Sequence, residues 1–300
     1  MRTLLIGHGY IGSYLEPQLR ASGLDLVVCD QDERRAQSVH AGVHARYQDL
    51  STEFLATFDT ILWFAGHSSV PMSIADPEGA FANNCVDLLA LARRKRRETR
   101  LIYASSASVY STPLGSGGDD VSPQDETQTR LNPTNPYDAT KLAFDALAGC
   151  YAENVTGVRL GTVSGFSPRL RRELVFNAMN LSAMREGRVR LANGRASRAI
   201  LFLDDLAHYV LAMISHPGPL PQIVNLASYN VCFEELASEI AGHYDVPIEL
   251  LPDGPTYSFR VNWNLARTLF GDRPERDLCT RCREFTNDVE SVEEGKACVK

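Results

Sequence analysis

The sequence predicts an α/β fold with a doubly wound parallel sheet, and two observations support that prediction. Short aliphatic and β-branched runs alternate with helical stretches along the first half of the chain, which is the pattern of strands joined by crossover helices. The first run, Thr3 to Ile6, leads directly into a glycine-rich turn at 7–13 and then into a helix through Arg20. A strand, a glycine turn and a helix in this order form the first unit of a Rossmann-type sheet.

Composition excludes several classes of protein. With 300 residues, of which 44% are hydrophobic and 22% charged, the chain is long enough to bury a full core in one large domain or two smaller ones. No apolar run approaches the roughly 20 residues needed to cross a bilayer. The start goes straight into a strand without a signal-peptide pattern, so we expect a cytoplasmic protein with no membrane partner. A net charge of −7 argues against a nucleic-acid partner.

The cysteines do not indicate a disulfide framework. There are seven, an odd number scattered along the chain, which is typical of free thiols. Cys279 and Cys282 have CxxC spacing, which leaves a zinc or redox site open, but the sequence shows neither a second pair nor a histidine close by. We therefore predict no metal.

The glycine turn predicts a dinucleotide site made by Gly7, Gly9, Tyr10, Ile11 and Gly12. Glycines at this spacing permit a tight turn, a close approach to a diphosphate and close packing of the helix on the strand. The next apolar run, 24–29, ends at Asp30, where a carboxylate would accept hydrogen bonds from the adenosine ribose. This favours NAD over NADP, although Arg34 and Arg35 follow closely and keep a 2′-phosphate open.

Two further apolar runs, 60–65 and 100–104, place polar or small residues at strand ends. Ligands of such sheets lie off the carboxyl ends of the strands, so we expect Phe64, Ala65, Gly66 and Ser105 to face the cofactor. His67 would be a ligand or general base, or simply a polar residue of the cleft, and we favour the last. Asp49 and Leu50 would bracket the adenine, with a helix cap as the alternative.

Tyr137 and Lys141 stand four residues apart, so a helix places both side chains on one face. A free tyrosine has a pKa of about 10, and near pH 7 only about one in a thousand is phenolate. Lys141 and a positively charged nicotinamide ring would together favour the phenolate. The pair predicts proton removal from an alcohol or sugar hydroxyl, although the spacing alone is also typical of ordinary surface pairs.

Two other segments carry less information. The apolar helix expected at 81–92 ends in the basic run 93–97. A nucleic-acid contact is one interpretation of that run, but cations in the last turn of a helix also complement its dipole, and we favour this. The glycine-rich stretch 114–120 predicts a loop near the mouth of the site.

Several motifs together resemble one family. They are GHGYIGS at 7–13, FAG at 64–66, Asn84 in its helix, SSASVY at 105–110 and YDATK at 137–141. The chain resembles the extended short-chain dehydrogenase/reductases, and among them the NAD-dependent nucleotide-sugar epimerase/dehydratase group that contains UDP-galactose 4-epimerase. The resemblance implies that Ser106 is the catalytic serine, Tyr137 the acid/base and Lys141 the residue that binds the nicotinamide ribose. It also implies that Asn84 supports the lysine through water.

The resemblance extends to the substrate region. It implies an NAD-binding Rossmann domain at 1–165 plus about 199–227, and a smaller, mostly helical substrate-binding domain at 166–198 plus about 228–300. Between 166 and 198 stand eight arginines against two acids, which suits a nucleotide-diphosphate sugar. The residues expected to bind that substrate are Ser106, Thr162, Asn177, Arg198 and Tyr257. Thr162 and Tyr257 depart from the family's usual asparagine and arginine, and this leaves room for an unusual or shorter substrate.

The same resemblance implies a reaction type and an assembly. Family dehydratases place an Asp-Glu pair after the catalytic hydroxyl residue, whereas here Ala107 and Ser108 follow Ser106. This favours a 4-epimerase over a 4,6-dehydratase or a ketoreductase. A non-catalytic NAD-binding regulator is a further alternative, which the intact Ser106, Tyr137 and Lys141 oppose. The apolar helices at 85–92 and 141–152 resemble those of the family's dimer interface, so we expect a homodimer.

Overall fold

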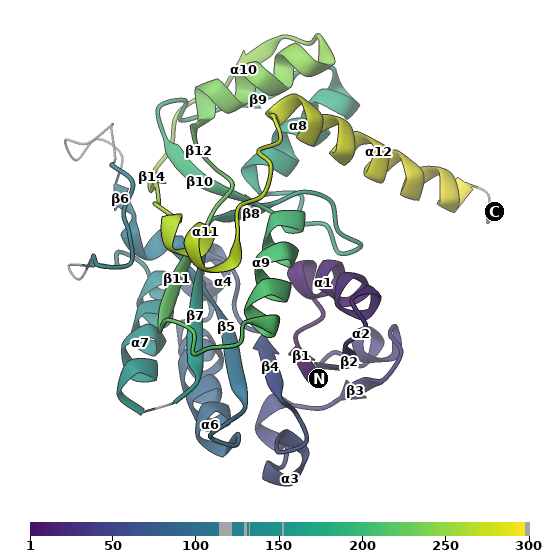
Figure 1. Cartoon of the computed structure of the whole chain (residues 1–300). Helices are drawn as coiled ribbons and strands as arrows, with labels where there is room; N and C mark the ends of the chain where they lie inside the picture. Colours follow the sequence, from purple (N-terminus) through teal and green to yellow (C-terminus); the bar gives the residue numbers. More distant parts are fainter. Residues whose placement is uncertain (114–121, 129–130, 132, 152, 298–300) are drawn as a thin grey trace.

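The computed structural model describes residues 1–113, 122–128, 131, 133–151 and 153–297, so the predicted loop at 114–120 lies outside the described residues. A parallel, seven-stranded sheet forms its centre, in the order β11-β7-β5-β4-β1-β2-β3 (Figure 1). The strands are β1 Arg2–Ile6, β2 Asp25–Asp30, β3 Gly42–His44, β4 Thr60–Trp63, β5 Arg100–Ser106, β7 Val155–Leu160 and β11 Ile223–Leu226. The predicted doubly wound sheet is thereby confirmed.

The strand order places a cleft at the middle of the sheet. The chain runs outward from β1 to β3 and then returns to add β4 on the other side of β1. Ligands of open parallel sheets bind where the direction of winding reverses, beyond the carboxyl ends of the strands. The glycine turn after β1 and the segment after β4 meet at this point.

Helices cover both faces of the sheet, because strands buried on two sides must pack against apolar helix faces. One face carries α1 Tyr10–Ala21, α9 Leu203–Ser215 and α11 Asn264–Phe270, which share one hydrophobic core with the sheet. The other carries α3 Thr52–Leu55, α6 Asp87–Arg94 and α7 Pro136–Tyr151 around a second core. Shorter helices are α2 Glu33–Gln37, α4 Val70–Ala75 and α5 Pro77–Phe81, with 3₁₀ turns at Tyr47–Asp49 and Ala107–Tyr110.

The helix predicted at 81–92 is interrupted. A π-helical turn, Ala82–Val86, lies between α5 and α6. In the basic run that follows, Arg94 Nη1 donates to the carbonyl oxygens of Gln48 and Leu50, and Lys95 Nζ donates to that of Glu153 at 2.8 Å. These cations thus hold neighbouring backbone segments, which supports the structural interpretation of the run.

A smaller region lies above the sheet edge in Figure 1 and has its own core. Its helices are α8 Val175–Glu186, α10 Phe233–Tyr244 and α12 Leu278–Ala297. Its strands are β8 Thr162–Ser164, β9 Val189–Leu191, β10 Ser197–Phe202, β12 Tyr229–Cys232 and β13 Ile248–Leu250, while β14 Tyr257–Ser258 pairs with β6 Thr112–Pro113. The region is mixed rather than mostly helical. The predicted domain boundaries stay a prediction, and α11, inside the 228–300 segment, packs on β11 and α9.

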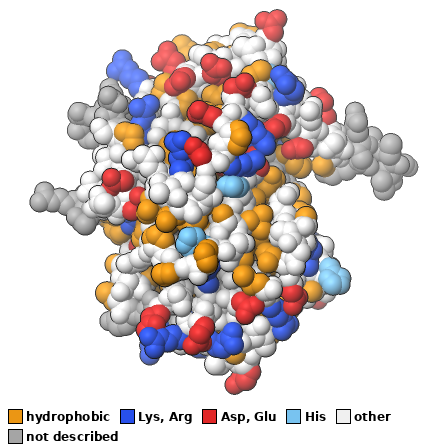
Figure 2. Space-filling model, viewed as in Figure 1, with side chains coloured by type: hydrophobic (Ala, Val, Ile, Leu, Met, Phe, Trp, Pro, Cys, Tyr) orange, Lys and Arg blue, Asp and Glu red, His pale blue; other side chains and the backbone are white. Residues whose placement is uncertain are grey.

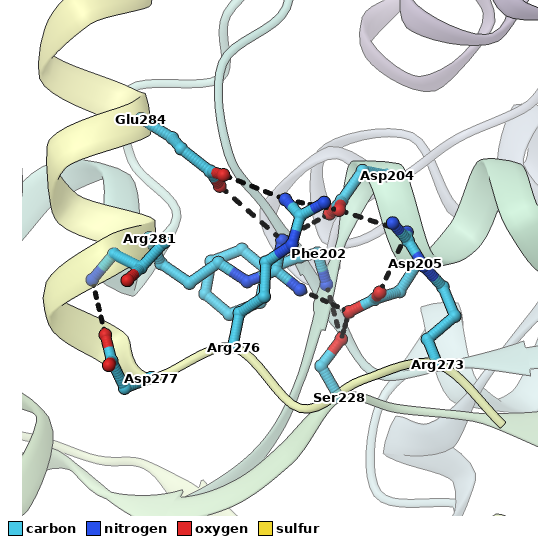
Figure 3. Close-up of polar contacts among 10 residues, drawn as sticks. Phe202, Asp204, Asp205, Ser228, Arg273, Arg276, Asp277, Arg281 and Glu284 are labelled. Atoms are coloured by element: carbon cyan, nitrogen blue, oxygen red, sulfur yellow. Dashed lines mark hydrogen bonds and ion pairs between the residues drawn. The ribbon is translucent and has the colours of Figure 1, made fainter.

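An ion-pair network ties the carboxyl-terminal segment to α9 (Figure 3). The buried guanidinium of Arg281 reaches Asp204 at 2.5 Å and Asp205 at 2.6 Å, and Arg273 contacts both carboxylates at 3.0 and 3.1 Å. Arg281 also stacks on the Phe202 ring. Removing one partner of a buried ion pair costs about 3–5 kcal/mol because the other charge is left alone. These ion pairs therefore hold the segment after residue 270 and the start of α12 against α9. The sequence assigns no function to this segment.

The CxxC pair lies in the first turns of α12. Cys282 is buried, and Cys279 Sγ lies 3.4 Å from Nδ1 of His243 on α10. This histidine is distant in sequence and was not expected. In the part of the chain that the structure describes, no three His, Cys, Asp or Glu side chains gather as metal ligands.

Charged side chains of both signs are mixed on the surface. On the face shown in Figure 2, lysine and arginine side chains are interspersed with aspartate and glutamate at both ends, and hydrophobic side chains gather across the middle. Among the described residues, no helix combines the length and apolar character needed to span a membrane.

Candidate active site

A cavity of about 690 Å³ opens at the carboxyl ends of the central strands. Its lining includes twelve of the predicted site residues: Tyr10, Ile11, Phe64, Ala65, Gly66, Ser105, Ser106, Tyr137, Lys141, Thr162, Arg198 and Tyr257. The others, which lie around it or away from it, are Gly7, Gly9, Gly12, Asp30, Asp49, Leu50, Asn84 and Asn177. The fold thus brings the strand ends, the Tyr137 helix and the smaller region together around one cavity.

The three glycines of the turn are required for different reasons. Gly7 has φ +99°, and a Cβ there would lie 2.6 Å from the Ala65 nitrogen, while a Cβ on Gly12 would lie 1.9 Å from the Gly7 oxygen. Both are fixed by packing of the turn on the protein itself. At Gly9 the nearest atom to such a Cβ is 4.0 Å away, so protein packing does not explain the glycine. The open backbone there, at the start of α1, fits the predicted approach of a diphosphate.

Asp30 stands at the end of β2, as predicted, and is 2% exposed. Its two oxygens accept hydrogen bonds from the backbone nitrogens of His8 at 2.7 Å and Asp32 at 2.8 Å. Arg35 Nη1 lies 4.0 Å from the carboxylate. The carboxylate therefore holds the glycine turn against the second strand, at the place where a ribose would follow the diphosphate.

Asp49 and Leu50 lie away from the cavity. Asp49 is exposed in a 3₁₀ turn after β3. The Leu50 side chain is buried in the core under α6, and its carbonyl oxygen accepts from Arg94. The alternative was a helix cap, and that role belongs to Ser51, whose hydroxyl accepts from the Phe54 nitrogen at the start of α3. The adenine contact of Asp49 and Leu50 stays a prediction.

Tyr137 and Ser106 both line the cavity. Ser106 ends β5 and Tyr137 is the second residue of α7. Burial raises the pKa of Tyr137 to about 12, against the opposing effects of the Ser106 hydroxyl and the Arg171 charge. With protein groups alone, burial outweighs these two effects, so the low pKa expected from the sequence is not a property of the Tyr137 helix by itself.

Lys141 points from α7 to the end of β5. Its Nζ donates to the Ala104 carbonyl oxygen at 2.8 Å and lies 5.8 Å from the centre of the Tyr137 ring. Burial lowers the pKa of Lys141 to about 8, while the charge of Asp145 opposes this shift. Asp145 is itself held by Arg159 at 2.9 Å. Lys141 therefore places a positive charge in the lining of the cavity beside Tyr137.

Asn84 occupies the π-helical turn and contacts the strand-end segment. Its Nδ2 donates to the His67 carbonyl oxygen and to Thr140 Oγ1, both at 3.1 Å. Its buried Oδ1 has no hydrogen-bond partner among the described residues. Gly66 has φ +130°, and a Cβ there would lie 2.3 Å from this oxygen. The free acceptor fits the water-mediated role that the resemblance implies, and π turns often occur at functional sites.

Arg198 is placed differently from a free phosphate ligand. Its guanidinium donates to the backbone oxygens of Ser197 and Tyr257 and to Thr256 Oγ1. It also stacks 4.2 Å from the centre of the Tyr257 ring and lies near Phe233 at 5.1 Å. These contacts make Arg198 part of an aromatic wall of the cavity, formed with Phe233, Tyr257 and Phe259.

Asn177 is fully buried beside the cavity. Its Oδ1 accepts from the Gly165 nitrogen at 2.9 Å, and its Nδ2 donates to Tyr10 Oη and to the Arg171 carbonyl oxygen. The amide is thus engaged in holding the loop 165–174 on the glycine turn, and the expected diphosphate contact would require these bonds to exchange.

Sequence reasoning missed several cavity residues. The arginine-rich composition marked the segment that contains Arg171, but only the structure shows its Nη1 donating to the Ser68 carbonyl oxygen at 3.1 Å across the cavity. Phe233 and Phe259 also line the cavity. They come from distant segments without a motif, so no signal in the sequence identifies them.

Comparison with known proteins decides the family. The NAD dependent epimerase/dehydratase family model matches residues 3–227. The chain belongs to this family. Its cofactor is NAD, and the glycine turn and Asp30 fit that cofactor.

Two curated relatives and one solved structure illustrate the similarity. A UDP-glucose 4-epimerase of Corynebacterium glutamicum is 29% identical over 82% of both chains. That of Lacticaseibacillus casei is 32% identical over 55% of this chain and 52% of its own, so the match spans about half of that relative. The structure of an NAD-dependent NDP-hexosamine 5,6-dehydratase of tunicamycin biosynthesis shares the fold, with a TM-score of 0.81 and 21% identity over 97% of this chain and 98% of that one.

Proposed function

We propose that this protein is an NAD-dependent nucleotide-sugar 4-epimerase. The observation that carries the proposal is the placement of Ser106, Tyr137 and Lys141 in the lining of one cavity. A tyrosine with a serine hydroxyl beside it can move one proton to and from a sugar hydroxyl. Bound NAD supplies the complementary chemistry, since it accepts a hydride from the sugar carbon and returns it.

The protein's residues divide the remaining work. Tyr137 takes the proton of the O4 hydroxyl and gives it back, Ser106 orients that hydroxyl, and Lys141 places a positive charge beside the phenol. The loop 165–174, held by Asn177, contributes Arg171, Glu173 and Leu174 to the cavity wall. To change configuration, the sugar must turn over between the two hydride transfers, and a cavity of about 690 Å³ lies within the range typical of small-molecule sites.

A nucleotide-diphosphate sugar is the proposed substrate. The wall of Phe233, Tyr257 and Phe259 offers flat apolar surfaces, which suit a base. Arg198, which stacks on these rings and donates to the protein itself, adds only its positive charge to this wall. Arg171, with Glu173 at 2.7 Å, also lines the cavity and is a second cation for the diphosphate. The relatives are named for UDP-glucose, and UDP-hexoses are therefore the first to test.

A dehydratase is the second candidate, because one structural neighbour has that activity. It needs a further acid and base beside the sugar, and Ala107 and Ser108 follow Ser106 where such groups would stand. An NAD-binding regulator would have no chemical need for the geometry of Ser106, Tyr137 and Lys141.

Turnover in deuterated water tests the proposal. UDP- and dTDP-hexoses are incubated with the protein and NAD, and the recovered sugar is examined by mass spectrometry. Epimerisation yields an isomer of unchanged mass, because the hydride returns to the same carbon. Loss of one water, or deuterium at C5, would identify a dehydratase, and no reaction of any nucleotide sugar would remove the proposed function.

We also propose a homodimer that uses the face near α5 and α6. Phe81 and Val86 are 48% and 50% exposed there, and Met72 and Ile74 of the neighbouring α4 are exposed too. Exposed apolar side chains that gather on one face are typical of interfaces. Replacing Phe81 and Val86 with glutamate should yield a monomer by light scattering at micromolar concentration, whereas a monomeric wild type would contradict the proposal.

A further inference from the structure

A buried carboxylate is linked to the proposed catalytic pair by two serine hydroxyls. Asp138 Oδ1 accepts a hydrogen bond from Ser108 Oγ, and Ser108 Oγ is 2.7 Å from Ser106 Oγ. Ser106 in turn lines the cavity with Tyr137, and its hydroxyl lowers the pKa of that residue. Four oxygens thus follow one another from the cavity to a side chain that is 0% exposed.

We propose that Asp138 is the terminal proton acceptor for Tyr137, reached through Ser108 and Ser106. This inference rests on the proposed function, because it concerns the proton of the sugar hydroxyl. It makes Asp138 and Ser108 positioning and relay residues, whereas Ser106 and Tyr137 face the substrate.

The geometry fixes Asp138 for this task. Asn135 holds its other oxygen with an Nδ2 donor at 2.6 Å, and Asn135 Oδ1 accepts from the Asp138 backbone nitrogen at 3.0 Å. Asp138 does not line the cavity, whereas Ser106, Ser108 and Tyr137 do. A proton that leaves Tyr137 along this chain therefore reaches a carboxylate without entering bulk water.

The relay explains how a tyrosine in this environment can act as a base. Burial holds the pKa of Tyr137 far above neutral pH, so the phenolate is scarce in the protein alone. Burial also raises the pKa of Asp138 above its ordinary value, which makes its carboxylate a better acceptor. Burial causes both pKa shifts. In the relay, the raised pKa of Asp138 helps it accept the proton that the raised pKa of Tyr137 would otherwise retain.

Each bond in the step is accounted for. The O–H bond of the sugar breaks and its proton binds Tyr137 Oη, while the Tyr137 proton passes to Ser106. The Ser106 proton passes to Ser108, and the Ser108 proton binds Asp138. The sugar carbon loses its hydride to the nicotinamide, and every tyrosine and serine ends neutral. Reduction of the ketone reverses all the transfers.

Other charged and titratable groups face this row of oxygens, and the variants that test the relay leave those residues unchanged. They are Arg171, Lys141 and Tyr257 around Tyr137, and Tyr257 with the Ser111 hydroxyl around Asp138.

The relay predicts opposite effects on the Tyr137 pKa and on turnover when Ser108 is lost. While Asp138 is ionised, Ser108 donates to it and accepts from Ser106, so Ser106 is not free to donate to a phenolate. Ser108→Ala removes that competing acceptor but leaves Asp138 in place. The phenolate should therefore form at lower pH, and turnover at pH 7 should nevertheless fall, by roughly 10²-fold, because the proton has lost its path. If Ser108 had only an electrostatic or packing role, its loss would not lower the Tyr137 pKa and turnover together.

The experiment follows both quantities in the NAD-loaded protein. Tyrosinate absorbance at 295 nm is titrated in wild type, Ser108→Ala and Asp138→Asn, with the Tyr137→Phe curve subtracted, and turnover is measured from pH 5 to 9. Ser108→Thr, which keeps a hydroxyl, is the matched control and should restore both values. In Ser108→Ala and Asp138→Asn, turnover should rise about tenfold per pH unit, because only the phenolate fraction then reacts.

Two results would overturn the relay. One is a Tyr137 titration in Ser108→Ala that equals that of wild type, which needs no substrate to establish. The other is a pH profile and a turnover rate of Ser108→Ala that equal those of the wild type. A wild type that converts no nucleotide sugar would instead contradict the proposed function, so the two failures are distinct.

Discussion

Two parts of the cavity lining are built in different ways. Around the end of β5, Ser106, Tyr137 and Lys141 come from one strand end and the first two turns of one helix, and Lys141 is held by its hydrogen bond to the Ala104 carbonyl oxygen. In the aromatic wall, Arg198 and Tyr257 come from separate segments and meet by stacking. The first part is suited to moving a proton over a fixed distance, and the second to holding a flat, charged ligand. Substitutions in the two parts should therefore separate turnover from binding.

The largest effect is expected from Tyr137→Phe. Turnover should fall by about 10²–10⁴-fold, the usual contribution of a general acid–base group. NAD binding and thermal stability should stay close to wild type, because the ring and its packing remain. Calorimetric titration with NAD provides the control. Full activity of this variant would remove the mechanism.

Lys141→Ala should affect both turnover and cofactor binding. A hydrogen bond to a charged group contributes about 1.5–3 kcal/mol, so we expect NAD affinity to fall about 10- to 100-fold in addition to the loss of turnover. Titration calorimetry measures the affinity. A variant that loses turnover but binds NAD as wild type does would show that the lysine acts on Tyr137 alone.

A smaller effect is expected in the aromatic wall. Tyr257→Leu keeps an apolar side chain but removes the ring that stacks on Arg198. A cation–π contact of this kind contributes about 0.5–2 kcal/mol, so KM for the nucleotide sugar should rise up to about 30-fold while kcat changes little. A fall in kcat with an unchanged KM would instead assign Tyr257 a role in the chemical step.

The smallest expected effect is a decline of activity in mild base. The pKa of Lys141 is lowered to about 8, so its positive charge is present below that pH and is lost above it. Turnover should therefore fall to half near that pH as the lysine loses its proton. Lys141→Arg, whose charge persists to higher pH, should move this decline upward in the same buffers. An unchanged profile in the arginine variant would assign the decline to another group.

Local motifs explain why many of the site residues were predictable. The glycine turn and the spacing of Tyr137 and Lys141 are patterns within a few residues, and Asp30 is marked by its place at the end of the second strand. The contacts of Gly7 with Ala65 and of Asp30 with His8 join segments that lie far apart in the sequence. Asp49 and Leu50 show the limit of this reasoning, because residues of a turn after a short strand can face solvent, the core or a ligand. The sequence alone does not choose between these directions.

The sequence by itself determined the parallel sheet, the glycine turn and the proximity of Tyr137 to Lys141, because each depends on a repeat or spacing along a continuous stretch. The tertiary structure decided what surrounds them. Asp138 is adjacent to Tyr137 in every conformation, but only the packing of α7 on β5 joins its carboxylate to Ser108 and Ser106. The burial of Tyr137 and Asp138 sets the pKa of the phenol and the path of its proton. That burial depends on contacts between segments that are distant in the sequence, which no local pattern reveals.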